Sequence, residues 1–246
     1  SLLKSFADLL GGCRDKVEAY AGGVDLYFSL DELLAQAKRY LDQGFRAIKM
    51  KVGRDDYRED LKRVEAMRST IGDRVTLMVD ANMKWSVPQA IRMGKALEPF
   101  GIYWMEEPTI PDDVAGHARI ASTVSIPVAA GENLYTKHEF QRYLEAEALG
   151  FVEPDVARVG GITEWMKVAA LAASYNLNVT SHGVDELHVH LLAAIPNSSY
   201  LERHSFRVDQ YLLDPFPVEE SYVRVPQRPG HGVAFDMQKL APLRVA

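Results

Sequence analysis

The sequence predicts an α/β protein whose alternating strands and helices close into a parallel β/α barrel. Short apolar runs alternate with longer amphipathic stretches along most of the 246 residues. Three of these runs end in a carboxylate, at Asp80, Glu106 and Glu132, and their common interval of 26 residues is about the length of one strand plus one helix. Seven or eight such units in series favour a closed barrel over an open sheet.

The individual elements follow from the periodicity of the apolar residues. We predict strands near 17–21, 46–51, 75–80, 102–106, 127–131, 151–154, 177–181 and 199–202. We predict helices near 31–43, 56–71, 87–98, 113–123, 137–147, 163–174 and 185–194. The strands and helices therefore alternate without interruption over this part of the chain.

Capping residues mark the ends of the predicted helices, because short polar side chains accept hydrogen bonds from the free N–H groups of a first turn. The N-cap candidates are Ser29 or Asp31, Asp55, Ser86 with Pro88 just inside, Asp112, Thr136, Thr163 and Asp185. Gly44 and Gly72 follow the first two helices, where a C-terminal glycine is common.

Two segments lie outside this alternation. Residues 1–16 lead into the barrel, which we expect over 17–204. Residues 205–246 are typical of a short strand, a Pro/Gly turn and an extended tail, which covers the bottom of the barrel or belongs to a second domain. Because the chain begins inside an apparent helix, we expect a further segment before residue 1.

The composition argues against several kinds of partner. The net charge is −6 and no basic stripe is present, which argues against nucleic acid. No apolar run is long enough to cross a bilayer, so we expect no membrane partner. The single cysteine, Cys13, excludes an internal disulfide and fits a reducing compartment, so we predict a cytoplasmic protein.

Polar residues follow most of the predicted strands, at the barrel end where active sites of this architecture lie. Asp80, Glu106 and Glu132 occupy matched positions on three neighbouring strands. Three carboxylates would repel one another unless a hard cation held them, so we predict a Mg²⁺ site. We prefer Glu106 over Glu107 as the ligand, because Glu106 lies 26 residues from both Asp80 and Glu132.

Lys49 and Lys51 lie two apart on a predicted strand, so both side chains face the barrel interior. Two neighbouring ammonium groups should lower each other's pKa, and a metal should add to this effect. A neutral lysine could then act as a base. On this reasoning we name both as candidate catalytic residues.

His182 follows the seventh strand and Asp155 follows the sixth, so the two should be neighbours. A carboxylate beside an imidazole fixes its tautomer and stabilises its cation. Lys51 and the His182–Asp155 pair would then flank a substrate held at the metal. Asn82 follows the third strand, and Glu202 follows the eighth.

These motifs, in this order, resemble the mandelate racemase subgroup of the enolase superfamily. The resemblance runs from about residue 13 to 235 and rests on KxK, VDAN, EEP, GEN, PDxxRVGGIT, SHG and LE. It implies a modified (β/α)7β TIM-like barrel with an N-terminal α+β capping domain. That capping domain is absent from this sequence, and residues 205–246 resemble the segment that returns to it.

The resemblance also implies a role for each residue. Asp80, Glu106 and Glu132 would bind Mg²⁺, and Asn82 would lie beside the metal and a substrate hydroxyl. Lys51 would be the acid/base on one face of the substrate and His182, paired with Asp155, on the other. Lys49 would neutralise the substrate carboxylate, and Glu202 would hydrogen-bond the enediolate intermediate.

Within the subgroup the motifs are most similar to acid-sugar dehydratases of the galactarate/talarate type. This implies a hydro-lyase that removes the proton α to a carboxylate, eliminates the β-hydroxyl as water and yields a 2-keto-3-deoxy sugar acid. A racemase, epimerase or cycloisomerase could use the same two bases, and a non-catalytic sugar-acid-binding barrel is a third hypothesis. We expect a small carboxylate substrate and, from the family, a homo-oligomer.

Overall fold

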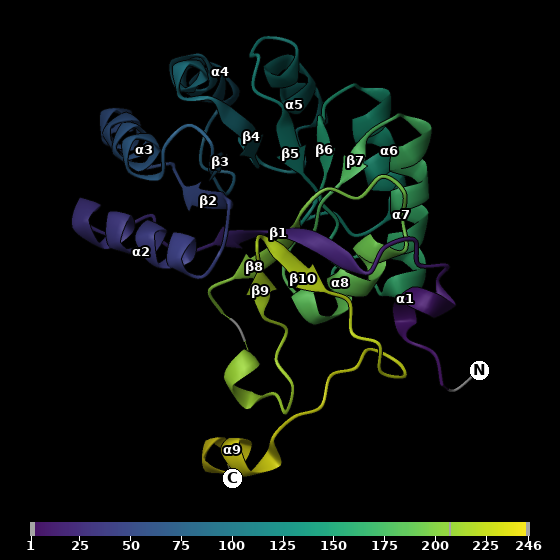
Figure 1. Cartoon of the computed structure of the whole chain (residues 1–246). Coiled ribbons are helices and arrows are strands. Elements are labelled where there is room, and N and C mark those ends of the chain that lie inside the picture. The colour runs from purple at the N-terminus through teal and green to yellow at the C-terminus, as the bar shows by residue number, and fades with distance from the viewer. Residues whose placement is uncertain (1–2, 207, 245–246) are drawn as a thin grey trace.

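The computed structural model describes residues 3–206 and 208–244 and has the predicted barrel (Figure 1). The barrel strands are β1 (Lys16–Gly22), β2 (Ala47–Lys51), β3 (Thr76–Asp80), β4 (Ile102–Glu106), β5 (Val128–Ala130), β6 (Phe151–Val152), β7 (Asn178–Val179) and β8 (Leu201–His204). Strands β1 to β7 pair in parallel in chain order, and β8 returns to pair with β1. A parallel bridge between Val179 and Ser198 links β7 to the segment before β8, so the prediction of a closed α/β barrel is confirmed.

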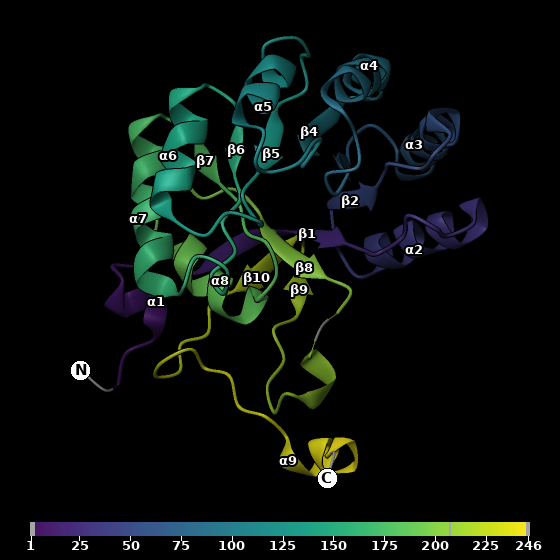
Figure 2. The same cartoon turned by 180° about the vertical axis from the view of Figure 1, so that it is seen from behind.

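The helices that follow β1 to β7 lie outside the strands and cover them, as Figures 1 and 2 show from two sides, and short helices lie near the two ends of the chain. They are α1 (Phe6–Leu9), α2 (Leu30–Asp42), α3 (Tyr57–Ile71), α4 (Val87–Leu97), α5 (Val114–Ala121), α6 (Lys137–Glu145), α7 (Ile162–Ser174), α8 (Asp185–Ala193) and α9 (Met237–Leu240). Three short 3₁₀ turns are η1 (Glu98–Phe100), η2 (Asp209–Tyr211) and η3 (Ala241–Leu243). No helix within 3–206 or 208–244 has both the length and the apolar character to cross a membrane.

Three of the predicted helix starts are confirmed. Ser29, Ser86 and Thr136 each form a capping box, in which the side chain and a Glu or Gln three residues later satisfy each other's backbone N–H groups. These caps fix where α2, α4 and α6 begin. They thereby set the lengths of the loops that follow β1, β3 and β5.

Four other predicted helix starts are wrong by one or two residues. The caps are Asp56 and Asp113 rather than Asp55 and Asp112, because the later aspartates reach the free N–H groups of Arg58 and Gly116. Helix α7 follows Gly161, not Thr163, and α8 follows Val184, not Asp185. Both of these residues have positive φ, 117° and 38°, so the backbone turn itself sets the start of the helix.

The barrel interior is divided into two layers. Its lower layer is apolar and is formed by Tyr20, Ala47, Met78, Trp104, Ala129 and Phe151. Because side chains alternate along a strand, the next inward positions carry Lys49, Asp80 and Glu106. The larger hydrophobic core lies between the strands and the surrounding helices. Apolar packing therefore supports a polar upper layer from below.

The segment after β8 returns to the first strand. Strand β10 (Tyr222–Arg224) pairs antiparallel with β1 from Lys16 to Glu18, and β9 (Val218–Glu219) pairs with β10. Val223 is fully buried, and Leu212 and Phe216 join the main core. Sequence analysis predicted one strand here, and the structure has two. Helix α9 stands apart from the barrel in both views (Figures 1 and 2).

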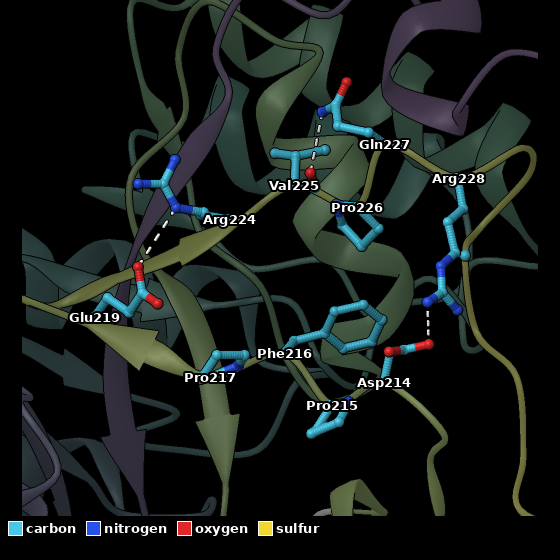
Figure 3. A pocket seen from close by; sticks show the side chains of 11 residues that line it. Asp214, Pro215, Phe216, Pro217, Glu219, Arg224, Val225, Pro226, Gln227 and Arg228 are labelled. Atoms are coloured by element: carbon cyan, nitrogen blue, oxygen red, sulfur yellow. Dashed lines mark hydrogen bonds and ion pairs between the residues drawn. The ribbon is translucent and has the colours of Figure 1, made fainter.

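A small cavity of about 220 Å³ lies within this returning segment (Figure 3). Phe216 and three prolines line its apolar part. Two surface ion pairs border it: Arg224 with Glu219 at 3.4 Å, and Arg228 with Asp214. None of the described residues that line this cavity belongs to the polar upper layer of the barrel, so the cavity is not part of the site described next.

Candidate active site

The three predicted metal ligands meet at the upper end of the barrel. The strand register aligns Lys51 with Asp80 and Asp80 with Glu106, and Glu132 follows β5. One carboxylate oxygen from each of Asp80, Glu106 and Glu132 lies within 4.8 Å of the others. Asp80 and Glu106 are fully buried. Three hard oxygen donors that converge in this way fit a single Mg²⁺ ion, with positions left for water and substrate.

Lys49 lies below this cluster and is almost fully buried. Its Nζ is 2.6 Å from Glu106 Oε1, 3.0 Å from Glu202 Oε1 and 3.1 Å from the Tyr20 hydroxyl. Burial alone would lower the pKa of Lys49, but the surrounding carboxylates outweigh it and raise the pKa well above its ordinary value. Lys49 is therefore a fixed positive charge at the floor of the site.

Lys51 lies at the end of the same strand and is more accessible. Its Nζ forms an ion pair with Asp80. Burial lowers the pKa of Lys51, yet the carboxylates of Asp80 and Glu106 together outweigh burial and raise it. Lys49 lowers the pKa of Lys51, as predicted, but the neighbouring carboxylates outweigh this effect and raise the pKa of both lysines. The further lowering expected from a metal ion stays a prediction.

A buried network of charged side chains holds the backbone at Lys51. The Lys51 N–H donates to Asp25 Oδ1 at 2.8 Å, and the Lys51 carbonyl accepts from Arg63 Nη1 at 2.9 Å. Arg63 also donates to the Asp25 carbonyl, and Asp60 accepts from the N–H groups of Gly53 and Arg54. The sequence alone did not predict this network, whose members come from the loop after β1 and from α3.

His182 lies on the opposite side of the carboxylate cluster from Lys51. Its Nδ1 is 2.9 Å from Asp155 Oδ2, and its Nε2 is 3.2 Å from Glu132 Oε2. Burial would lower the pKa of His182, but the hydrogen bond to Asp155 and the charges of Glu202 and Glu132 raise it to about 9. Asp155 also accepts from the N–H groups of Ala157 and Arg158, which fixes its orientation.

Glu202 connects the floor of the site to the His182 loop. Its Oε1 contacts Lys49, and its Oε2 accepts from the Gly183 N–H at 2.7 Å. Burial would raise the pKa of Glu202, but Lys49 and His182 hold it well below its ordinary value. Glu202 is therefore ionised and rigidly placed.

Two residues with positive φ shape the turns after β3 and β4. Asn82 has φ 42°, and its backbone N–H donates to Asp80 Oδ1 at 2.8 Å, which orients that carboxylate. Glu107 has φ 39° and turns away from Glu106, so that its Oε1 accepts from Asn133 at 2.8 Å. Burial, with the charge of Glu132, raises the pKa of Glu107 to about 7.

Comparison with known proteins identifies the family of this chain. Residues 32–239 match the family described as "Enolase C-terminal domain-like". The chain belongs to the enolase superfamily. The resemblance to its mandelate racemase subgroup is confirmed by the named relatives, which include a solved mandelate racemase/muconate lactonizing enzyme from Polaromonas sp. JS666 that is 37% identical.

The curated relatives include a cycloisomerase and a dehydratase. A 3,6-anhydro-alpha-L-galactonate cycloisomerase of Streptomyces coelicolor is 50% identical over 96% of this chain and 66% of its own length. An L-talarate/galactarate dehydratase of Salmonella typhimurium is 36% identical over 96% of this chain and 58% of its own length. The chain thus spans about two thirds or less of these relatives.

Solved structures of related enzymes also superpose closely on this chain. A racemase from Streptomyces coelicolor with bound magnesium has a TM-score of 0.95 and 48% identity, over 99% of this chain and 67% of that one. An L-talarate dehydratase from Polaromonas sp. JS666, complexed with Mg and L-glucarate, has a TM-score of 0.91 and 38% identity, over 98% and 67%.

This enolase-superfamily barrel contains two further buried polar residues that sequence analysis missed. The Tyr20 hydroxyl accepts from Lys49 and donates to Glu153 Oε1 at 3.3 Å. Burial raises the pKa of Glu153 from 4.5 to about 8, and its Oε2 has no hydrogen-bond partner among the described residues. The available signal was spacing, because Glu153 lies two residues before Asp155 after a buried strand.

Proposed function

We propose that this chain carries the catalytic barrel of a Mg²⁺-dependent enzyme that removes the proton α to the carboxylate of a sugar acid. The observation that supports this most strongly is the convergence of Asp80, Glu106 and Glu132 between two proton-transfer groups. Lys51 contacts the Asp80 side of the cluster, and His182 contacts the Glu132 side. A binding protein needs neither base, so this arrangement argues for catalysis.

Asp80, Glu106 and Glu132 would hold the metal, as their hard oxygen donors and spacing allow. When bound, Mg²⁺ would stabilise the negative charge that develops on the substrate carboxylate and, as a nearby positive charge, lower the pKa of Lys51. Lys49 and Glu202 would fix the charge at the floor of the site. Preorganised charges of this kind stabilise an enediolate without rearrangement.

Lys51 and His182 would transfer protons on opposite faces of the substrate. In the forward direction one group takes the C2 proton, and the C2–H electrons form the enediolate. The C3–O bond then breaks, the leaving oxygen takes a proton, and the resulting enol tautomerises to a 2-keto-3-deoxy acid. His182, held as a cation by Asp155, is the group suited to donate the proton to the leaving oxygen.

The leaving group separates two candidate reactions. In a 3,6-anhydro sugar acid the oxygen on C3 belongs to the ring, so elimination opens the ring and yields an isomer. In an open-chain sugar acid that oxygen is a hydroxyl and departs as water. Sequence analysis placed dehydration first. The 50% identity to a cycloisomerase now favours ring opening, and the 36% identity to a dehydratase supports dehydration as the second candidate.

Hydrogen exchange tests the shared step. The full-length protein is incubated with Mg²⁺ and sugar acids in D₂O, and NMR follows deuterium at C2 together with 2-keto acid formation. Lys51→Ala and His182→Asn should each lower exchange or product formation by about 100-fold or more, while Mg²⁺ binding persists. Unchanged exchange and turnover in both variants would refute the assignment.

Mass spectrometry of the product separates the two reactions. Ring opening gives a keto acid with the mass of the substrate, and dehydration gives one that is lighter by one water. Racemisation or epimerisation would exchange the C2 hydrogen without forming any keto acid. The three outcomes exclude one another for a given substrate.

A further inference from the structure

A second histidine, His188 on α8, lies fully buried near the His182–Asp155 pair. Both of its ring nitrogens bond to backbone groups. Its Nε2 accepts from the Val156 N–H at 3.1 Å, and its Nδ1 donates to the Gly183 carbonyl at 2.6 Å. Val156 directly follows Asp155, and Gly183 directly follows His182. One imidazole therefore joins the backbone beside Asp155 to the backbone beside His182.

These two contacts fix the tautomer of His188. A backbone N–H can only donate, so Nε2 carries no proton, and a carbonyl can only accept, so Nδ1 carries one. Burial lowers the pKa of His188, which favours this neutral ring. A positively charged ring would lose the acceptor that the Val156 N–H needs. His188 thus bonds to both loops only as the neutral Nδ1–H tautomer.

The backbone around Asp155 is held from two directions. Trp165 of α7 donates its indole N–H to the Pro154 carbonyl at 2.9 Å, one residue before Asp155. The Trp165 ring also packs against His188 with a centroid distance of 5.8 Å, and both side chains are fully buried. The Asp155 carboxylate therefore extends from a segment that has little freedom to shift.

The backbone after His182 is held in a similar way. The Gly183 N–H donates to Glu202 Oε2 at 2.7 Å, and the Gly183 carbonyl accepts from His188. Gly183 has φ 57° and Val184 has φ 38°, and a valine in this conformation needs support from its surroundings. Without the bond from His188 this turn could relax and move the His182 imidazole, whose Nδ1 lies 2.9 Å from Asp155.

We propose that His188 is a positioning residue for proton transfer: as a neutral ring protonated on Nδ1, it sets the distance between the His182 imidazole and the Asp155 carboxylate by bonding to the backbone beside each. The proposal rests on the proposed function, because it assigns His188 an effect on proton transfer by His182. A misplacement of about 1 Å in such a pair can lower the rate by about 100-fold.

His190, two residues later on α8, provides a matched comparison. It is also fully buried and also bonds to two backbone groups. Its Nδ1 accepts from the Ala7 N–H at 3.3 Å, and its Nε2 donates to the His231 carbonyl at 3.0 Å. These partners lie in α1 and in the segment after β10, so they hold neither loop of the His182–Asp155 pair. His190 should therefore be the opposite tautomer, protonated on Nε2.

The tautomers can be measured directly on the full-length protein. Solid-state NMR of the ¹⁵N-histidine-labelled enzyme distinguishes protonated from unprotonated ring nitrogens. His188→Gln and His190→Gln assign the two sets of signals by their loss. We expect the proton on Nδ1 of His188 and on Nε2 of His190. A proton on Nε2 of His188 would overturn the proposal, because the bond from the Val156 N–H could not form.

Kinetics with Mg²⁺ and the sugar acid that the enzyme converts test the effect on the reaction. His188→Leu should lower kcat by about 10- to 100-fold while KM stays within about threefold. His188→Asn has an amide nitrogen at the position of Nδ1 and can still donate to Gly183, so it should lose only about three- to tenfold in kcat. His190→Leu should leave kcat within about twofold, even where it destabilises the protein as much as His188→Leu does.

An unchanged kcat in His188→Leu, or an equal loss of kcat in His190→Leu, would make His188 an ordinary core residue and overturn the proposal. Where His188→Leu does not fold, His188→Asn decides in its place, since an unchanged kcat overturns the proposal and the expected partial loss supports it. Failure of the proposed function would look different: no acid would exchange its C2 hydrogen even in the wild type, whatever the tautomer of His188.

Discussion

At the residue scale, Glu106 and Glu107 show how one backbone turn separates two adjacent carboxylates. Glu106 ends β4 and points into the barrel, where Lys49 and the Trp104 indole N–H contact it. Glu107 has positive φ and contacts Asn133 instead. Only Glu106 belongs with Asp80 and Glu132 in the group that could share an ion.

This difference predicts opposite results for two neighbouring substitutions. Glu106→Gln should weaken Mg²⁺ binding by about 100-fold or more, because the affinity of a hard cation follows the number of charged oxygen ligands. Glu107→Gln should leave the affinity within about threefold. Isothermal titration with Mg²⁺ measures both. A larger loss of Mg²⁺ affinity in Glu107→Gln than in Glu106→Gln would show that Glu107, and not Glu106, is the metal ligand.

Glu153 predicts a pH-dependent stability. The folded state holds its proton up to about pH 8, whereas the unfolded state releases it near 4.5. The contribution of Glu153 to the free energy of unfolding should therefore fall as the pH rises between these values, by no more than about 5 kcal/mol in total. The stability of Glu153→Gln relative to the wild type should rise across this window and level off above it.

Urea unfolding at several pH values measures this trend. Glu65→Gln, at an exposed position on α3, is the matched control and should follow the wild type at every pH. A difference between Glu153→Gln and the wild type that stays constant from pH 5 to 8 would contradict the proposed burial of a protonated Glu153.

The sequence predicted the composition of the site better than its electrostatics. The interval of 26 residues, and the location of active sites at the carboxyl ends of barrel strands, were enough to select Asp80, Glu106 and Glu132. The structure brings these three carboxylates together. The predicted lowering of the lysine pKa values left out the carboxylates that surround each ammonium in space and that raise the pKa of both lysines. Glu153 was missed, because it lies inside the predicted strand 151–154 and only Asp155, directly after that strand, was considered as a site residue.

At the element scale, the loop after β2 depends on a buried arginine in α3. Arg63 contacts Asp25 and Asp60 and is 5% exposed in its side chain. Arg63→Met would leave two buried carboxylates uncompensated and should lower the free energy of unfolding by about 3–5 kcal/mol. It should also lower kcat, because the backbone of Lys51 loses a hydrogen-bond partner.

Arg58 on the same helix supplies the control for this prediction. Its pair with Asp56 is 3.7 Å long and exposed, so Arg58→Met should change stability by no more than about 0.5 kcal/mol. Urea unfolding and steady-state kinetics compare the two variants. Equal changes in the free energy of unfolding and in kcat for the two variants would show that the buried network does not stabilise this loop.

Some helix boundaries could not be predicted from the sequence, because two adjacent residues were equally good N-cap candidates. Asp55 and Asp56, like Asp112 and Asp113, are equally good by residue type, and only the backbone angles select the second of each pair. Ser86 and Thr136 were named without an alternative, and each forms a capping box in the structure. At Ser29 the capping box decides between the two candidates, Ser29 and Asp31.

At the scale of the whole molecule, the segment after the barrel is part of its packing. Val223 in β10 is fully buried against β1. Val223→Ala should therefore lower the free energy of unfolding by about 2 kcal/mol, whereas Leu213→Ala, at a side chain that is 60% exposed, should have an effect below about 0.5 kcal/mol. Urea unfolding measures both, and a neutral Val223→Ala would mean that this segment does not stabilise the barrel.

The barrel itself was predictable because its strands and helices alternate at a regular interval. The fold of residues 205–246 was less predictable, because the two short strands β9 and β10 show no periodic pattern of apolar residues. They take their conformation from pairing with β1 and with each other. Homo-oligomer formation and a cytoplasmic location stay predictions.

A crystal structure of the full-length protein soaked with Mn²⁺ tests the central claim most directly, because Mn²⁺ accepts the same oxygen ligands and gives an anomalous signal. We predict one anomalous peak at about 2.1 Å from oxygens of Asp80, Glu106 and Glu132, between Lys51 and His182. A peak elsewhere, or none in a protein that turns over its substrate, would contradict the proposed mechanism.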